Sequence, residues 1–193
     1  QATLQSFFGI AYWTLFFFTP ALTMRLLAEE KKTGTIELLL TKAVTDRQVV
    51  MGKFLAAFLL VTTALAFTFP YVITLAYIGD IDAGEIVCGY AGLALMSASY
   101  ISIGIYASSL TNNQIVAFLL SMSIGLFFHI LFEVLASNFT GVTALVLSTL
   151  SLNNHFESIS RGVVDTRDLI YFASLIFLGL FLAEMSLTKR NLN

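Results

Sequence analysis

Apolar residues in this chain gather in long runs that are separated by short polar stretches. Five runs reach about 20 residues, the length that an α-helix needs to cross a bilayer core about 30 Å thick. These runs cover residues 7–27, 52–78, 86–110, 114–136 and 169–187. The pattern predicts an all-α, polytopic helical membrane protein with five spans and no soluble domain.

Composition agrees with this fold class. The chain has 193 residues, of which 58% are hydrophobic and 11% are charged, far below the roughly 25% of charged residues in soluble domains. We therefore expect membrane lipid to surround the spans. The net charge of -2 does not favour a nucleic-acid partner. Cys88 is the single cysteine, which excludes an internal disulfide and a metal site built from cysteines.

Charged residues predict the orientation of the spans. Basic residues surround the first connection and follow the last run: Arg25, Lys31, Lys32, Lys42, Arg47, Lys53, Lys189 and Arg190. Because successive spans alternate in direction, both places lie on one face, which the positive-inside rule makes cytoplasmic. The N-terminus is then outside and the C-terminus inside. The opposite connections carry acidic residues: Asp80, Asp82, Glu85, Glu157, Asp165 and Asp168.

The longest charged stretch, residues 25–47, connects the first two spans. Gly34 is expected to interrupt the incoming helix, because glycine readily adopts the left-handed conformation that ends many helices. The residues after Gly34 mix apolar and charged side chains, and they predict a short cytoplasmic amphipathic helix that is typical of a docking element. Thr45 and Gln48 then have the spacing of a capping box that begins the second span.

Part of this stretch carries a family resemblance. Residues 29–40, EEKKTGTIELLL, resemble the E-(E/K/R)-x-x-G-T-x-E-x-L-L element of ABC-2 type transporter permeases. In that family the element includes a coupling helix, which contacts a separate ATP-binding subunit. The resemblance implies partner-coupling roles for Glu29, Glu30, Gly34, Thr35, Ile36, Glu37, Leu38, Leu39 and Leu40.

Members of this family typically have six spans with both termini in the cytoplasm. The resemblance therefore implies that residues 1–193 form a single ABC-2 type transmembrane domain that lacks its first span. The missing initiator methionine supports this expectation. The resemblance also implies a location in the bacterial cytoplasmic (inner) membrane, and assembly with a second permease copy or a sister permease.

Two further runs, residues 103–118 and 155–172, resemble the gliding-motility-associated branch of ABC-2 permeases. The function implied is that of the transmembrane permease subunit of an ATP-driven exporter, serving gliding motility or a linked secretion system. Two alternatives stay open at this point. One is an ATP-independent channel or carrier, and the other is a membrane scaffold that moves no solute.

The sequence lacks the glycine-rich phosphate-binding motif of ATPases, because Arg47 stands where the first glycine should precede Gly52 and Lys53. Protease and hydrolase motifs of the H-E-x-x-H and G-x-S-x-G types are also absent. We therefore expect that this chain is no enzyme and binds no cofactor. The resemblance places ATP and Mg in the partner subunit.

His129 and Glu133 lie one helical turn apart within the fourth run. An ionisable residue inside a span is a functional candidate, because a buried charge is costly in a membrane. Two side chains are too few for a metal site, which needs three or four ligands. The pair is predicted either to line a translocation path or to form a hydrogen bond near the outer interface.

The remaining patterns concern helix breaks and helix packing. Pro20 and Pro70 lie inside spans and predict kinks, because proline lacks a backbone donor. Small residues recur at helical spacing through the third run, from Ala94 to Ser108, and favour close helix packing. In the long connection before the last span, residues 142–152 suit an interfacial or re-entrant helix, followed by a second short helix that ends at Gly162.

Overall fold

The computed structural model describes residues 4–35, 45–79 and 82–190. In this part of the chain all regular structure is helical. Five helical segments are long and apolar enough to cross a membrane: Gln5–Thr33, Asp46–Ile78, Ala83–Leu110, Gln114–Asn138 and Thr166–Lys189. Each contains one of the five predicted runs. The predicted all-α polytopic architecture is therefore confirmed.

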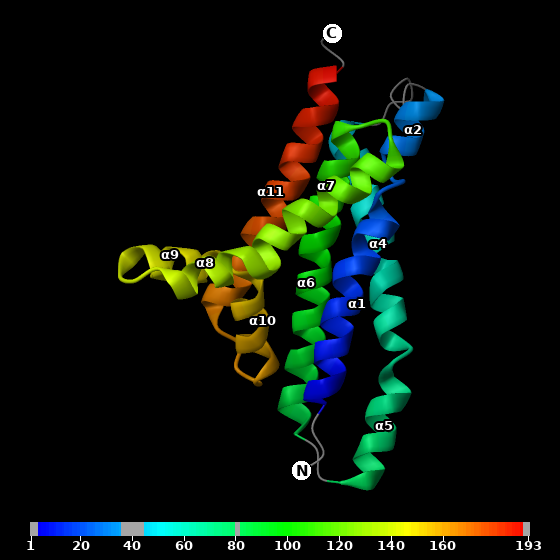
Figure 1. Ribbon diagram of the computed structural model, residues 1–193. Coiled ribbons are helices and arrows are strands. Elements are labelled where there is room, and N and C mark those ends of the chain that lie inside the picture. The colour runs from blue at the N-terminus through cyan, green and yellow to red at the C-terminus, as the bar shows by residue number, and fades with distance from the viewer. Residues whose placement is uncertain (1–3, 36–44, 80–81, 191–193) are drawn as a thin grey trace.

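Helix α6 (Ala83–Leu110) is the central element of the bundle (Figure 1). In its most apolar stretch 67% of the residues are buried, whereas the other four spans bury between 22% and 39%. The helices that pack on it are α1 (Gln5–Thr23), α4 (Asp46–Ala66), α7 (Gln114–Leu126), α10 (Leu152–Ser160) and α11 (Thr166–Arg190). Helix α6 therefore contacts a helix of each of the other four spans.

Small side chains allow α6 to be surrounded in this way. A Cβ atom added to Gly104 would lie 2.0 Å from Oγ1 of Thr23, and one added to Gly89 would lie 2.2 Å from the ring of Phe8. A Cβ atom added to Gly179 of α11 would lie 2.7 Å from Oγ of Ser102 in α6, which is also too close for a real contact. The close packing predicted from the small residues of the third run is thus confirmed.

The first two spans are each divided by a break. Helix α1 continues through Pro20 to Thr23, and a non-helical turn at residues 24–27 separates it from α2 (Ala28–Thr33). In the second span, α4 ends at Ala66 and α5 (Phe69–Ile78) begins with Pro70 in its first turn. Because Pro70 has no N–H to donate, the ladder of helical hydrogen bonds stops there, as predicted.

The capping box predicted at the start of the second span is also confirmed. The backbone N–H of Gln48 donates to Oγ1 of Thr45 at 3.3 Å, and the N–H of Thr45 donates to Oε1 of Gln48 at 3.0 Å. These two bonds satisfy amides that the first turn of a helix leaves without partners.

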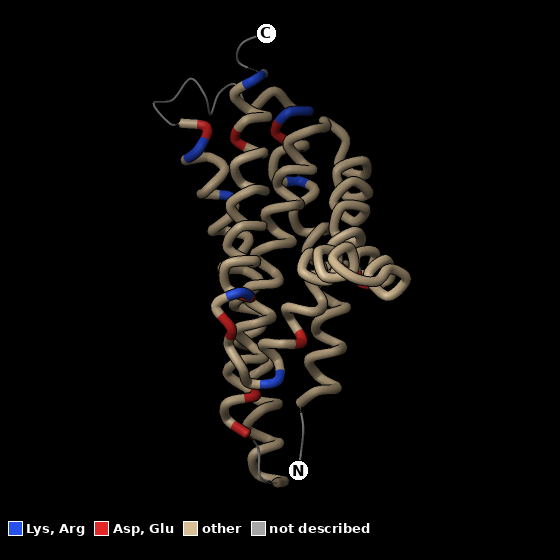
Figure 2. Tube along the Cα trace, turned by 90° about the vertical axis from the view of Figure 1, so that its left-hand side faces the viewer, with Lys and Arg blue, Asp and Glu red and all other residues tan. Residues whose placement is uncertain are grey.

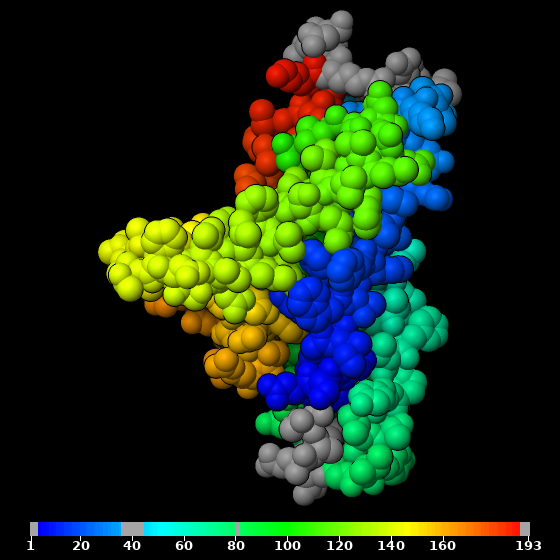
Figure 3. All heavy atoms as spheres, in the orientation of Figure 1, coloured from blue at the N-terminus to red at the C-terminus, as the bar shows by residue number. Residues whose placement is uncertain are grey.

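The fourth span leads into a lateral arm. Helix α7 passes into a π-helical turn, η1 (Phe127–Leu131), then into α8 (Phe132–Asn138) and α9 (Val142–Leu150). The α8–α9 arm projects from the side of the bundle, and α10 folds back beneath it (Figures 1 and 3). The two short helices predicted before the last span are α9 and α10, and Gly162 follows α10 with a positive φ of 86°.

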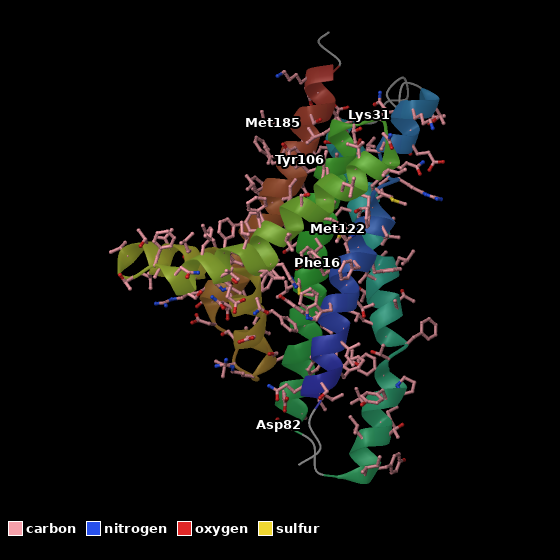
Figure 4. The ribbon with its side chains drawn as sticks, viewed as in Figure 1. Phe16, Lys31, Asp82, Tyr106, Met122 and Met185 are labelled. Carbon is pink, nitrogen blue, oxygen red and sulfur yellow. The ribbon has the colours of Figure 1, made fainter. Side chains whose placement is uncertain are left out.

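Charged residues mark two ends of the molecule. The end that carries α2, the start of α4 and the C-terminal part of α11 is called the basic end below (Figure 2). There Nζ of Lys53 lies 2.5 Å from Oε1 of Glu30, and the hydroxyl of Thr188 donates to Asp46. Asp82 lies at the opposite, acidic end (Figure 4). The fold thus brings together the two basic regions that helix alternation predicts on one face.

Replacing Gly104 by alanine is expected to lower the free energy of unfolding by about 1–3 kcal/mol, the usual cost of overpacking a core. Thr23, which the new methyl group would meet, is buried and donates a hydrogen bond to the carbonyl of Thr19, so it cannot easily move. Gly52→Ala is the matched control, because nothing lies within 4 Å of its added Cβ. Thermal unfolding in one detergent compares them, and equal midpoints would contradict this packing.

Candidate functional site

Helix α2 begins the predicted partner-coupling element. Glu29 is exposed on it, and the helix ends at Gly34, whose φ of 72° lies in the left-handed region. The break predicted at Gly34 is therefore confirmed. Thr35 is exposed, with its hydroxyl 2.9 Å from that of Thr33. The remaining predicted residues, Ile36, Glu37, Leu38, Leu39 and Leu40, lie outside the described part of the chain.

A single buried hydroxyl closes the break between α1 and α2. Oγ of Ser108, near the C-terminus of α6, accepts hydrogen bonds from the backbone N–H groups of Leu27 at 3.0 Å and Ala28 at 2.9 Å. The same hydroxyl donates to the carbonyl of Met24 at 3.0 Å. A serine hydroxyl has one donor and two acceptor sites, and all three are used here. Ser108 therefore replaces the backbone bonds that the turn at 24–27 interrupts.

The residue after Ser108 ties further helices to the same place. The carbonyl of Ser109 accepts a hydrogen bond from Nζ of Lys31 in α2 and another, of 3.1 Å, from the hydroxyl of Ser186 in α11. Carbonyls in the last turn of a helix lack intrahelical partners, and a cation is favourable beside them. Since Glu30 pairs with Lys53 of α4, side chains link α2 to α4 and α6, and α11 is bonded to the same carbonyl of α6. We call these contacts around Ser108 and Ser109 the basic-end junction.

The predicted coupling residues Glu29 and Glu30 differ in their surroundings. Glu30 is half-buried and turned toward Lys53, so its carboxylate holds α2 on the bundle. Glu29 is exposed and available to a partner. Beside them a groove of about 980 Å3 is lined by Lys31, Tyr106 and Met185, which gather at this end in Figure 4.

His129 lies within the bundle, far from the basic end. The π-helical turn places its imidazole between the rings of Tyr12 and Phe16, at centroid distances of 4.2 and 4.5 Å with nearly parallel planes. Its Nδ1 is hydrogen-bonded to the hydroxyl of Tyr100. The side chain is fully buried, and Nε2 has no hydrogen-bond partner among the described residues.

Glu133 has a different partner. Its Oε2 accepts a hydrogen bond of 2.9 Å from the amide of Asn153 in α10. His129 and Glu133 therefore do not form the hydrogen-bonded pair that was one of the two sequence-based interpretations. Both residues do line one hollow of about 770 Å3, between α1, the first turn of α6, η1, α8 and α10. We call it the outer hollow, since it lies toward the acidic end.

Several residues that build these two sites had no signal in the sequence. Ser108 belonged to a row of small residues that predicts packing, and nothing distinguished it from Ser97 or Ser102. Asp168 holds α10 against α11 through Nδ1 of His155 at 2.6 Å, a contact between residues in different helices. Tyr12 and Phe16 do have helical i, i+4 spacing, but that spacing alone is typical of any packed helix.

Removing the hydroxyl of Ser108 should destabilise the basic end. Ser108→Ala leaves the buried amides of Leu27 and Ala28 without partners, at about 1–3 kcal/mol for each. Ser97→Ala is the matched control, because Ser97 is buried in the same helix but its hydroxyl only donates to the carbonyl of Ala94. The expected result is a clearly lower unfolding midpoint for Ser108→Ala than for Ser97→Ala. Equal midpoints would show that water or a shifted backbone satisfies both amides.

Comparison with known proteins identifies the family. A search of curated proteins finds no match. A family model described as "ABC-2 family transporter protein" matches residues 5–183, nearly the whole chain. The match includes all five candidate spans except the last residues of α11. This protein therefore belongs to the ABC-2 transporter family and is a multi-pass transmembrane transporter subunit.

Proposed function

We propose that this chain is the permease subunit of an ATP-driven exporter, and that a separate ATP-binding subunit docks at its basic end. The observation that carries the proposal is the basic-end junction. A docking element transmits force only if it is fixed to the membrane helices, and α2, which leads into it, is fixed to α4 and α6 by side-chain contacts. The absence of a phosphate-binding motif from the sequence supports a separate subunit that binds ATP and Mg.

The junction suggests how nucleotide binding would act on the membrane helices. A displacement of α2 pulls on the end of α6 through Ser108 and on α11 through the carbonyl of Ser109. Because α6 packs against most of the bundle, a small displacement at the basic end changes the packing of several spans. ATP then biases an equilibrium between two packings of the bundle. In this scheme the basic end faces the cytoplasm.

His129 and Glu133 are proposed to belong to the translocation path. They line the outer hollow, at the end of the bundle opposite the docking element. A second permease copy or a sister permease would complete the path, as the resemblance to ABC-2 permeases implies. The proposed transport is outward, from the basic end to the acidic end.

Gly34→Val tests the docking element. Valine is strained at a φ of 72°, by about 1–2 kcal/mol, so the chain after α2 should change direction. Gly141→Val is the control, because Gly141 also has a positive φ, of 74°, and open surroundings, but a ψ of -144° at which valine is at least as strained, and it lies in the turn between α8 and α9. The measurement is co-purification from native membranes, followed by identification of any ATP-binding subunit and assay of its ATPase activity.

The expected result is that the wild type and Gly141→Val retain an ATP-binding subunit, while Gly34→Val loses it or fails to stimulate its ATPase activity. Equal retention and stimulation by both variants would contradict docking through this element. If the wild type retains no ATP-binding subunit, the exporter proposal fails and an ATP-independent channel or carrier is favoured. Retention without ATP-dependent flux in vesicles favours a membrane scaffold.

We further propose that the exporter serves gliding motility or a linked secretion system. The support is the resemblance of residues 103–118 and 155–172 to the gliding-motility-associated branch. Deleting the gene should abolish gliding on a surface without slowing growth, and the wild-type gene should restore gliding. Normal gliding of the deletion strain would contradict a role in gliding motility. It would not affect the proposal that the chain is an exporter subunit.

A further inference from the structure

The outer hollow has walls of two chemical kinds. Aromatic rings from α1 and α10 form one part: Phe8, Tyr12, Trp13 and Phe156. Tyr12 stacks on Phe156 at 5.2 Å and on His129 at 4.2 Å, so the rings form one continuous surface. The remaining wall is polar and includes three carboxylates, those of Glu85, Glu133 and Glu157.

Negative charge exceeds positive charge in this hollow. Among the described lining residues Arg161 is the one lysine or arginine, and its Nη2 lies 3.4 Å from Oε2 of Glu157. The partner of Glu133 is instead the neutral amide of Asn153. Within the described ranges no lysine or arginine pairs with Glu133 or Glu85. Glu133 and Glu85 therefore line the hollow without a basic partner, so a cation that enters it meets uncompensated negative charge.

His129 provides a second and independent indication of a ligand. Tyr12 and Phe16 stack on the imidazole, Trp13 lies edge-on to it at a centroid distance of 4.9 Å, and Tyr100 is hydrogen-bonded to its Nδ1. Nε2 is buried and has no hydrogen-bond partner in the described part of the chain, and it belongs to a side chain that lines the hollow. When Nδ1–H donates to Tyr100, Nε2 is an acceptor, the group that an ammonium N–H requires. A buried polar atom without a partner marks a place where a bound molecule completes the hydrogen bonding.

We propose that the outer hollow binds an organic cation, an amine or ammonium group attached to an apolar body, as the cargo of the transporter. That it is cargo rests on the proposed function; that the hollow binds a cation does not. The carboxylates of Glu133 and Glu85 would neutralise the cation, and the rings of Trp13 and Tyr12 would contact both the cation and its apolar body. Aromatic faces attract cations, tryptophan most strongly.

The chain carries its own reporter, because Trp13 is its single tryptophan and lines the hollow. Purified protein in an uncharged maltoside detergent is titrated with phenethylamine while tryptophan fluorescence is recorded. Phenylacetate and phenethyl alcohol have a similar size and the same ring. Phenylacetate carries a negative charge, and phenethyl alcohol is uncharged. The expected result is a saturable change with phenethylamine and none with the other two. Equal responses to all three, or a stronger response to phenylacetate, would overturn the proposal.

Glu133→Gln tests the carboxylate with little risk to folding, since a glutamine oxygen can still accept the hydrogen bond from Asn153. The loss of one charge-assisted contact should raise the Kd for phenethylamine roughly tenfold or more. Glu184→Gln is the matched control, because Glu184 lies at the basic end on α11 and lines the groove there. An unchanged Kd in Glu133→Gln would contradict the assigned site.

Two further comparisons complete the test. The first distinguishes a lipid headgroup from a soluble amine, and the second distinguishes failure of the cation site from failure of the exporter proposal. Short-chain phosphatidylethanolamine carries the same ammonium group on a lipid, so tighter binding than phenethylamine would assign a lipid headgroup and weaker binding a soluble amine. The titration needs no ATP-binding subunit. Phenethylamine binding without a co-purified ATP-binding subunit would support the cation site and contradict the exporter proposal. A co-purified ATP-binding subunit without phenethylamine binding would contradict the cation site alone.

Discussion

The structure depends on the satisfaction of backbone amides at a helix break inside an apolar bundle. A chain surrounded by lipid and apolar side chains has no water to solvate the groups that a break exposes. At the break the hydroxyl of Ser108 accepts hydrogen bonds from the backbone N–H groups of Leu27 and Ala28. It also donates one to the carbonyl of Met24. The first span can therefore change direction before α2 without leaving a buried amide unpaired, and α2 becomes attached to α6 by the same contact.

The position of α6 makes this local contact important for the whole molecule. Glycine, alanine and serine residues let neighbouring helices approach its backbone, so α6 touches α1, α4, α7, α10 and α11. Its C-terminal end is bonded to the start of α2, which leads to the proposed docking element, and its first turn contributes Glu85 to the outer hollow. One rigid helix thus connects the place where a partner would act with the place where cargo would bind. A π-helical turn in the fourth span completes the hollow by placing His129 beside Tyr12.

Much of the fold could be predicted from the sequence, because its determinants are local. The lengths of the apolar runs predicted the spans. The spacing of Thr45 and Gln48 predicted the start of a helix, and Gly34 and Gly162 predicted helix ends. The sites were less predictable, because they depend on side chains that meet across helices. Ser108 and Leu27 are 81 residues apart, and His129 and Tyr100 are 29 apart. A hydrogen bond between His129 and Glu133 was one of two interpretations, and it is not formed because each residue has a partner on another helix.

The most direct test of the account is hydrogen exchange at the amides of Leu27 and Ala28 in the purified chain, followed by NMR. The account predicts that both amides exchange as slowly as those in the middle of α6, although they lie at a helix break. In Ser108→Ala they should exchange rapidly, while amides in the middle of α6 remain protected. Rapid exchange in the wild type, or unchanged protection in Ser108→Ala, would contradict the claim that this hydroxyl joins the docking element to the bundle.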